Sequence, residues 1–342
     1  MDIRNRKGLR QYAAAALADN SGNPRLTVLV YVAVTALSSL LVSILTMILD
    51  NRISQTGGLG NLGLRSILTT IRQAAPLILG LALMGLDLGR QAVSLRLARR
   101  QQVEPRDLLK GYPRFGALLR ATILQVILYF LLLIVAVNIG SILFMMTPFA
   151  NNLYGILADV MLESDAIYEA LASDPAFLNE MFRAMLPAYP ICIGLFLLLA
   201  TPVFYRYRMT NYCLLDASHG GALMAMGESI RMTKGNRFAL FKLDLSFWWF
   251  WLGQMICTAV LYGDMICAKL GVALPWNATV SYYVFYVAAM VLEGALYYLT
   301  LNRVDATYAA AYDALRPQTQ APQGGVVLGN IFDLAKKYRD EQ

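Results

Sequence analysis

Charged side chains are scarce in this chain of 342 residues, where Asp, Glu, Lys and Arg make up only 15% of the sequence. Soluble proteins average about 25% charged and about 45–50% apolar residues, whereas 58% of this chain is hydrophobic. Such a composition leaves too little polar surface to cover a soluble core. We therefore exclude a water-soluble globular protein.

Motifs of enzymes and metal sites are missing as well. The sequence contains no H-E-x-x-H, no Walker glycine loop and no G-x-S-x-G nucleophile elbow. Its one histidine, His219, lies at a predicted helix start, where turn chemistry explains it better than catalysis. The four cysteines form no C-x-x-C pair. A disulfide between Cys192 and Cys267 stays an alternative that no sequence motif supports. We expect no enzymatic activity, no catalytic residue, no metal and no cofactor.

Long uncharged runs hold most of the apolar residues. A hydrocarbon layer of ~30 Å needs about 20 residues per helical crossing, and every backbone group in it must be paired internally. The runs therefore predict an all-α, polytopic membrane protein. Six transmembrane helices are expected at 26–49, 67–86, 121–146, 184–205, 245–263 and 280–301.

The cations predict the orientation of these helices. In this topology 24 of the 29 Lys and Arg residues fall on the side of the N-terminus, and such loops stay in the cytoplasm. We expect both termini to be cytoplasmic, with a basic segment at 1–25, a transmembrane domain at 26–316 and a linker with an amphipathic tail at 317–342. Attraction to anionic membrane lipids is sufficient to explain the net charge of +7, so no nucleic-acid partner is expected.

Two stretches, "LKGYPRF" at 109–115 and "TKGNRF" at 233–238, resemble each other. In each, the glycine predicts a left-handed residue that ends a short cytoplasmic helix, and the following cation would contact lipid phosphate. Membrane entry is favoured over a ligand site. The candidate lipid-interface residues are Lys110, Arg114, Lys234, Arg237, Trp248 and Trp249.

An acidic insertion at 147–186 is predicted on the outer side. Its apolar positions repeat with helical spacing, and Asp174 with Pro175 marks the start of a second helix. A pair of interfacial helices with a solvated face is favoured. The alternative is an acidic surface that gathers cations or binds a protein partner.

Glu293 interrupts the last apolar run, where an ionised side chain costs about 3 kcal/mol on insertion scales. Such a residue is a functional hypothesis by default, and it makes a secondary transporter or a channel-like protein the alternative function. The structural explanation is a hydrogen bond to a neighbouring helix, with Gly294 allowing close approach. A transporter would have a polar cavity lined by Glu293, whereas a scaffold would have a packed bundle and an exposed tail.

The tail supports a protein partner. After a linker rich in Gln and Pro, Ile331, Phe332, Ala335 and Tyr338 lie on one helical face, as in a docking or membrane-surface helix. We therefore interpret the chain as a non-enzymatic scaffold or accessory component of a membrane complex. Affinity purification in mild detergent would identify its partner.

The stretch from Cys213 to Leu252 resembles the bacterial membrane-protein family called domain of unknown function 975. The residues that carry this likeness are Asp216, Ala222, Ser229, Lys234, Gly235, Leu240, Phe241, Leu243, Leu245, Ser246, Phe247 and Trp249. The basic, alanine-rich opening and the segment from Asp305 to Leu315 are also similar, while the outer insertion and the linker near Pro317 depart from the pattern. The resemblance implies a multi-pass protein of the bacterial plasma membrane and implies no activity.

Single-cysteine labelling in a cysteine-free background tests the topology. We expect positions next to Arg100 and Arg231 to be shielded from a membrane-impermeant reagent applied to intact cells, because cation-rich loops remain inside. Positions next to Asp165 should react. External labelling next to Arg231 would contradict the assigned orientation.

Overall fold

The computed structural model describes residues 2–56, 61–161, 175–216, 220–272 and 274–316, and all regular elements in these ranges are helices. The prediction of an all-α fold is thus confirmed. His219, much of the outer acidic insertion and the whole tail after Arg316 lie outside the described residues.

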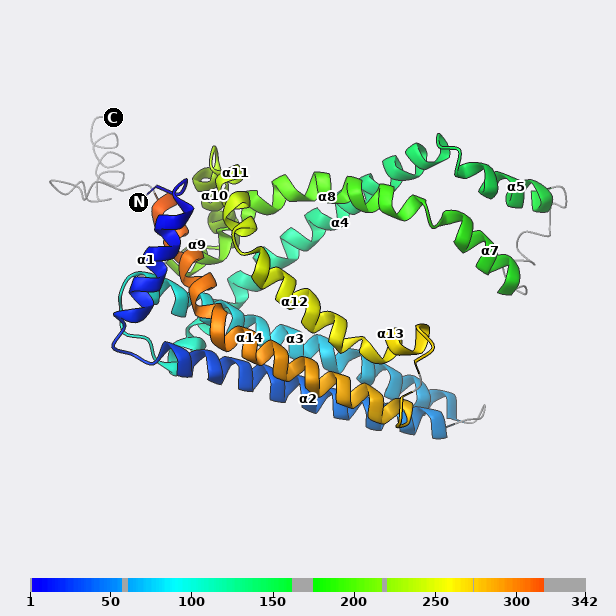
Figure 1. Cartoon of the computed structure of the whole chain (residues 1–342), viewed down its shortest axis with the longest axis horizontal. Coiled ribbons are helices and arrows are strands. Elements are labelled where there is room, and N and C mark those ends of the chain that lie inside the picture. The colour runs from blue at the N-terminus through cyan, green and yellow to red at the C-terminus, as the bar shows by residue number, and fades with distance from the viewer. Residues whose placement is uncertain (1, 57–60, 162–174, 217–219, 273, 317–342) are drawn as a thin grey trace, which may run out of the picture.

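The first arm of the molecule consists of α2 (Pro24–Gln55), α3 (Leu62–Ala98), α12 (Trp248–Leu261), α13 (Gly263–Lys269) and α14 (Ala278–Leu315). Helix α14 packs against α2, α3 and α12 and is thus the central helix of this arm (Figure 1). The second arm consists of α4 (Phe115–Met145), α5 (Ala150–Met161), α7 (Pro175–Met185) and α8 (Ala188–Tyr207), with α4 packed on α8.

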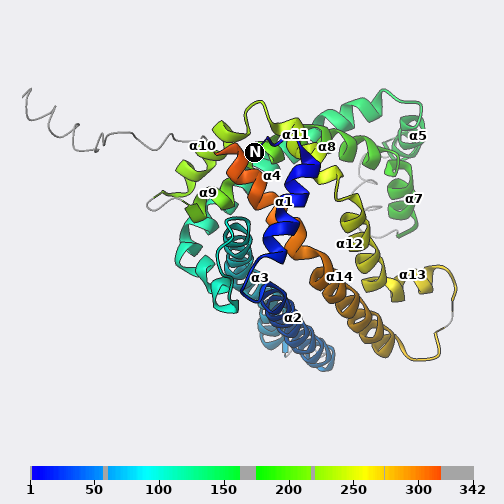
Figure 2. The same cartoon turned by 60° about the vertical axis from the view of Figure 1, so that its left-hand side comes forward.

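The two arms diverge from one end of the molecule, which we call the base (Figure 1). The base contains five short helices together with the ends of α3 and α14 that contact them. The short helices are α1 (Arg6–Ala18), the 3-10 helix η2 (Pro105–Arg114), α9 (Thr210–Asp216), α10 (Ala222–Thr233) and α11 (Arg237–Leu245). Helix α1 lies across α14 (Figure 2). The described N-terminal residues and the end of α14 are therefore on the same side of the molecule.

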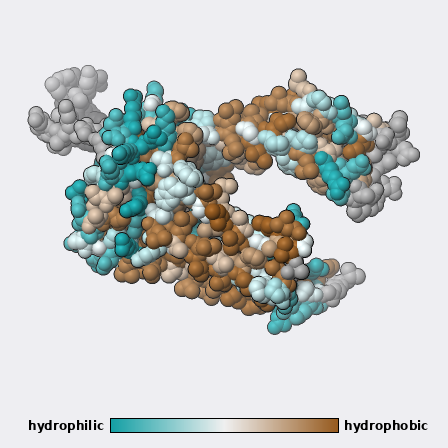
Figure 3. Space-filling model, in the orientation of Figure 1, coloured by the Kyte–Doolittle hydropathy of each residue, from teal (hydrophilic) through white to brown (hydrophobic). Residues whose placement is uncertain are grey.

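Burial is distributed unlike that of a soluble protein. The largest fully buried apolar side chains, such as Leu9, Leu97, Leu214 and Leu240, all lie in the base. In the arms many large apolar side chains are exposed, including Leu41 at 68%. Hydrophilic residues gather over the base, and hydrophobic residues cover the arms (Figure 3). Helices that cross a membrane expose apolar side chains to the surrounding lipid. The apolar surface of the arms is therefore typical of membrane-spanning helices.

Five helical segments are long and apolar enough to cross a membrane. If the bent pair α12 and α13 is counted as one span, there are six. The helix expected at 245–263 corresponds to α12, but it is shorter than predicted and a bend follows it. The chain turns after Leu245, α12 is only 14 residues long, and α13 is bent from it by 65°. The ring of Phe285 lies so close to Gly263 that a Cβ there would come within 2.5 Å of it, which marks the bend as a tight contact with α14.

The two Lys-Gly stretches turn out to differ. Gly235 has φ of 82° and follows α10, as expected. Gly111 is not left-handed, and η2 continues through it to Arg114. A Cβ on Gly111 would lie 2.0 Å from the carbonyl oxygen of Gly85 in α3, so the glycine is needed for a close backbone approach rather than for a helix end.

Candidate functional site

Two neighbouring cavities that share three lining residues lie among the helices of the first arm and at its junction with the base. The first has a volume of about 330 Å³ and is lined at the base by Arg90, Arg208 and Asp305. The second, of about 340 Å³, is lined by Glu293 and by polar residues of α2 and α12. Tyr31, Gln254 and Tyr297 line both. Since Asp305 and Glu293 are twelve residues apart on α14, the polar lining extends about 18 Å along that helix.

A buried ion pair forms the wall of the first cavity. Arg90 of α3 donates a hydrogen bond to Asp305 of α14, and their side chains are only 21% and 14% exposed. The Arg90 guanidinium also lies 5.4 Å from the ring centre of Tyr31 in α2. Three helices of the first arm therefore meet at one arginine.

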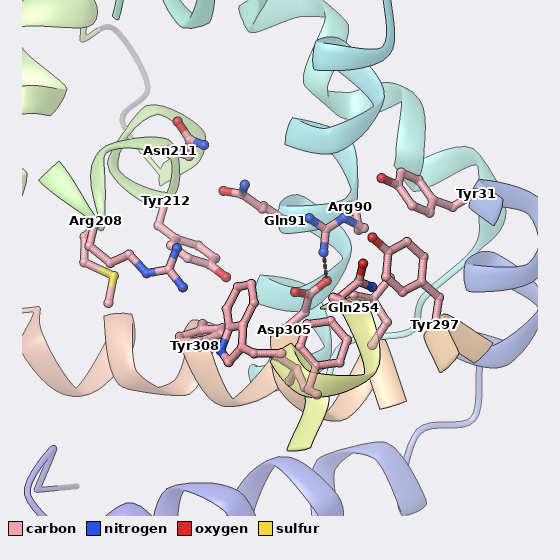
Figure 4. A pocket seen from close by; sticks show the side chains of 15 residues that line it. Tyr31, Arg90, Gln91, Arg208, Asn211, Tyr212, Gln254, Tyr297, Asp305 and Tyr308 are labelled. Atoms are coloured by element: carbon pink, nitrogen blue, oxygen red, sulfur yellow. Dashed lines mark hydrogen bonds and ion pairs between the residues drawn. The ribbon is translucent and has the colours of Figure 1, made fainter. Parts of the chain in front are cut away.

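Unsatisfied donors face the same region. Arg90 Nε and Gln254 Nε2 are buried and make no hydrogen bond by distance and angle within the described residues, and Arg90 Nε lies 3.9 Å from a carboxylate oxygen of Asp87. In Figure 4, Arg90 and Asp305 lie in the middle of the site, with Tyr31 and Tyr297 on one side and Arg208 and Tyr212 on the other. Buried polar groups are normally paired with protein or water. The two free donors therefore give the cavity an unused capacity to bind an acceptor.

Arg208 provides a second cation in the first cavity. Its guanidinium lies 4.5 Å from the ring centre of Tyr308 and 3.5 Å from a carboxylate oxygen of Asp244. Asp244 also accepts hydrogen bonds from Tyr308 and, at 2.7 Å, from Tyr205. This carboxylate thus ties α8, α11 and α14 together behind the cavity.

A further ion-pair cluster closes the base beside the cavity. Arg99 donates two hydrogen bonds of 3.0 Å to Asp216 and two, of 3.1 and 2.7 Å, to Asp313. Arg316 pairs with Asp216 at 2.9 Å. The acceptor oxygens of Asp216 and Asp313 raise the pKa of Arg99 above its ordinary value, so its charge is permanent. The cluster fixes α3, α9 and α14 relative to one another.

Glu293 lies on α14, half-buried, in the lining of the second cavity with Thr35, Ser39 and Thr258. A Cβ on the neighbouring Gly294 would lie 3.2 Å from Val32 of α2. The close helix approach expected at this glycine is therefore present. The polar cavity expected of a transporter is present at the same place.

The six candidate lipid-interface residues do not line either cavity. Lys110 pairs with Asp107 at 2.8 Å, and Arg237 has a buried Nε without a hydrogen bond. Trp248 is exposed at the start of α12, whereas Trp249 is partly buried against Phe247 and Phe250. Lys234 is exposed after α10, and Arg114 ends η2. A role for them in lipid contact stays a prediction.

Cysteine and metal chemistry add nothing to this site. Cys192 and Cys267 are both free, so they form no bridge. Within the described ranges, no group of three or more His, Cys, Asp or Glu residues is placed to hold a metal ion.

The sequence did not reveal Arg90, Arg208, Asp244 and Asp305 as members of a site. Each lies near the base end of an apolar helix, where a charge is usually an interfacial residue in contact with water. One signal was available. Asp305, Tyr308 and Tyr312 recur at spacings of three and four in α14, which places them along one side of that helix.

Replacing Asp305 with Asn tests whether the buried pair stabilises the fold. This change would leave Arg90 with only the more distant Asp87, whose carboxylate lies 3.9 Å from Arg90 Nε. We therefore expect unfolding in detergent to require up to about 3 kcal/mol less free energy. The control is Asp50→Asn, whose partner Arg72 lies 2.6 Å away with side chains 52% and 45% exposed. Asp50→Asn should lower the free energy of unfolding by only about 0–1 kcal/mol. Equal losses of unfolding free energy in Asp305→Asn and Asp50→Asn would contradict a stabilising role for the buried pair.

Comparisons with known proteins identify the family. Neither a search of curated proteins nor a search of solved structures gives a match. The sequence profile of a family described as protein of unknown function, DUF975, matches residues 1–301. The similar segment from Asp305 to Leu315 lies beyond that match. The chain is therefore a member of the DUF975 family and a polytopic membrane protein.

Proposed function

We propose that this protein is a membrane carrier that binds a small polar solute in the first cavity and uses Glu293 as a titratable group. The observation that carries the proposal is the shared lining of the two cavities by Tyr31, Gln254 and Tyr297. Through these residues the polar surface continues from the ion pair at the base to an acid inside an apolar helix. A helix bundle held together by apolar packing alone would not need such a lining.

The chemistry of the first cavity supports a solute that carries both polar and apolar groups. Arg90, Arg208 and Asp305 provide both signs of charge, and Arg90 Nε and Gln254 Nε2 are free to donate. Phe250, Trp251 and Leu301 provide apolar walls. Ligand sites in proteins commonly combine a few placed polar groups with such walls in volumes of about 300–1,000 Å³.

The second cavity supports the role of Glu293. An ionised carboxylate in hydrocarbon costs about 3 kcal/mol, and polar neighbours or water reduce this cost. Thr35 and Thr258 donate their hydroxyl protons to backbone carbonyls within their own helices, each at 3.0 Å. Their oxygens therefore remain available as acceptors for a protonated carboxyl or for water.

The bend between α12 and α13 supports movement next to the site. Gln254 and Thr258 of α12 line the cavities, and the 65° bend follows within one turn of Leu261. Broken helices at a binding site are common in secondary transporters. We propose that α12 shifts relative to α14 when the solute binds, and no covalent chemistry is required.

A scaffold or accessory role, which the sequence favoured, stays a prediction. The tail that supports it lies outside the described residues, and so does most of the acidic part of the outer insertion. Cytoplasmic placement of the base and of both termini is likewise part of our proposal. It depends on the distribution of Lys and Arg.

Glu293→Gln separates a carrier from a structural role. Glutamine keeps the shape of the side chain but cannot exchange a proton, so we expect unchanged thermal stability in detergent and loss of proton-coupled uptake. Uptake is measured with a pH-sensitive dye inside proteoliposomes under gradients of amino acids, carboxylates and sugars. Glu228→Gln, an acid exposed on α10, is the matched control and should behave like the wild type.

A structural role gives the opposite result. The wild type and Glu293→Gln would then be indistinguishable in every gradient. Glu293→Leu would lose stability by about 1–2 kcal/mol, the scale of a hydrogen bond between membrane helices. This pair of outcomes would contradict the carrier proposal.

A further inference from the structure

A basic groove lies on the base, separate from the two cavities of the first arm. Its volume is about 640 Å³, and it is bounded by α1, by the turn between α11 and α12, and by α14. Its cations are Arg6, Lys7, Arg10 and Arg303. Among the described residues, no acidic side chain lines it.

The groove follows from the helical spacing of α1. Leu9, Ala13 and Ala16 are buried and hold one face of α1 against the base. Arg6, Lys7 and Arg10 lie on the flank beside this buried face and line the groove. Arg303 and Thr307, one turn apart on α14, form the other wall.

The four cations differ from the arginines of the functional site. Arg90, Arg99 and Arg208 each pair with an aspartate, whereas none of the groove cations forms an ion pair within the described part of the chain. Arg10 lies 5.4 Å from the ring centre of Phe247, and Arg6 donates to the backbone carbonyl of Lys242 at 3.3 Å. These contacts position the side chains without neutralising them. The groove therefore concentrates positive charge and favours an anion.

The position of the groove indicates where that anion comes from. Its floor is the turn at Ser246 and Phe247, directly before the apolar helix α12 leaves the base. Trp249 lies in the groove, and tryptophan is enriched at the level of lipid headgroups. Further along α12, Leu252 and Met255 are exposed, Met255 at 69%. An acyl chain would thus find an apolar surface beyond the cationic groove.

We propose that this groove binds the phosphate headgroup of an anionic phospholipid, with its acyl chains along α12. A soluble phosphate would use the cations but would leave the apolar surface of α12 unused. The site is distinct from Lys110, Arg114, Lys234 and Arg237, which do not line it. It also does not depend on the carrier function.

Fluorescence quenching tests the proposal on the full-length chain. Trp248, Trp251 and Trp276 are replaced with Phe, so that Trp249 is the remaining tryptophan. The protein is placed in phosphatidylcholine nanodiscs that contain increasing fractions of phosphatidylglycerol with brominated acyl chains. Brominated phosphatidylcholine serves as the reference. We expect phosphatidylglycerol to quench Trp249 at a much lower lipid fraction than phosphatidylcholine does.

Removal of the charge should remove this preference. Because each cation near a membrane surface favours an anionic lipid by a factor of about five, Arg6→Gln, Lys7→Gln and Arg303→Gln together should lower the preference on the order of a hundredfold. The matched control replaces Arg106, Arg120 and Arg231 with Gln, which removes the same charge outside the groove. It should leave the preference nearly unchanged.

Three outcomes would overturn the proposal. Equal quenching by the two brominated lipids would show that the groove does not select a headgroup. An equal effect of both triple variants would show that only the overall charge matters. Displacement of brominated phosphatidylglycerol by millimolar inorganic phosphate at constant ionic strength would show that the ligand is a soluble anion.

Discussion

The ion pair between Arg90 and Asp305 is the interaction on which the first arm depends. Removing two opposite charges from water costs several kcal/mol per ion, so the pair is stable only while its surroundings hold both groups in place. Tyr31 and the neighbouring Arg208 provide that support. Because α14 also packs against α1, α2 and α12, the register that the pair sets between α3 and α14 determines the shape of both cavities.

The base and the arms follow different physical rules. The base packs apolar side chains inward, as a soluble domain does, and fixes its helices with ion pairs such as Arg99 with Asp216 and Asp313. The arms expose apolar side chains, and polar residues of α2, α12 and α14 line the second cavity inside the first arm. The second arm meets the base through η2, α10 and α11.

The sequence predicted what depends on local composition and did not predict what depends on distant partners. Apolar runs placed five of the six crossings, because hydrophobic length is a local property. The bend after α12 was missed, since Tyr262 and Gly263 belong to an uncharged run and the residue packed against Gly263, Phe285, is more than twenty residues away. Gly111 was misinterpreted for the same reason, because its close neighbour is Gly85.

Glu293 was found because an acid in an apolar run is conspicuous. Arg90 and Asp305 were not, because each resembles an ordinary interfacial charge until the two are brought together.

The central claim is that a polar path leads from the base to Glu293, and cysteine accessibility tests it most directly. A cysteine at Ser39, in the lining of the second cavity, and one at Leu41, exposed on the outer surface of the same helix, are compared in a cysteine-free protein in nanodiscs. Only a thiolate reacts, and hydrocarbon does not permit one to form. The account predicts that Ser39→Cys reacts with a small hydrophilic thiol reagent and that Leu41→Cys does not. Equal reactivity at the two positions, or none at Ser39→Cys, would contradict it.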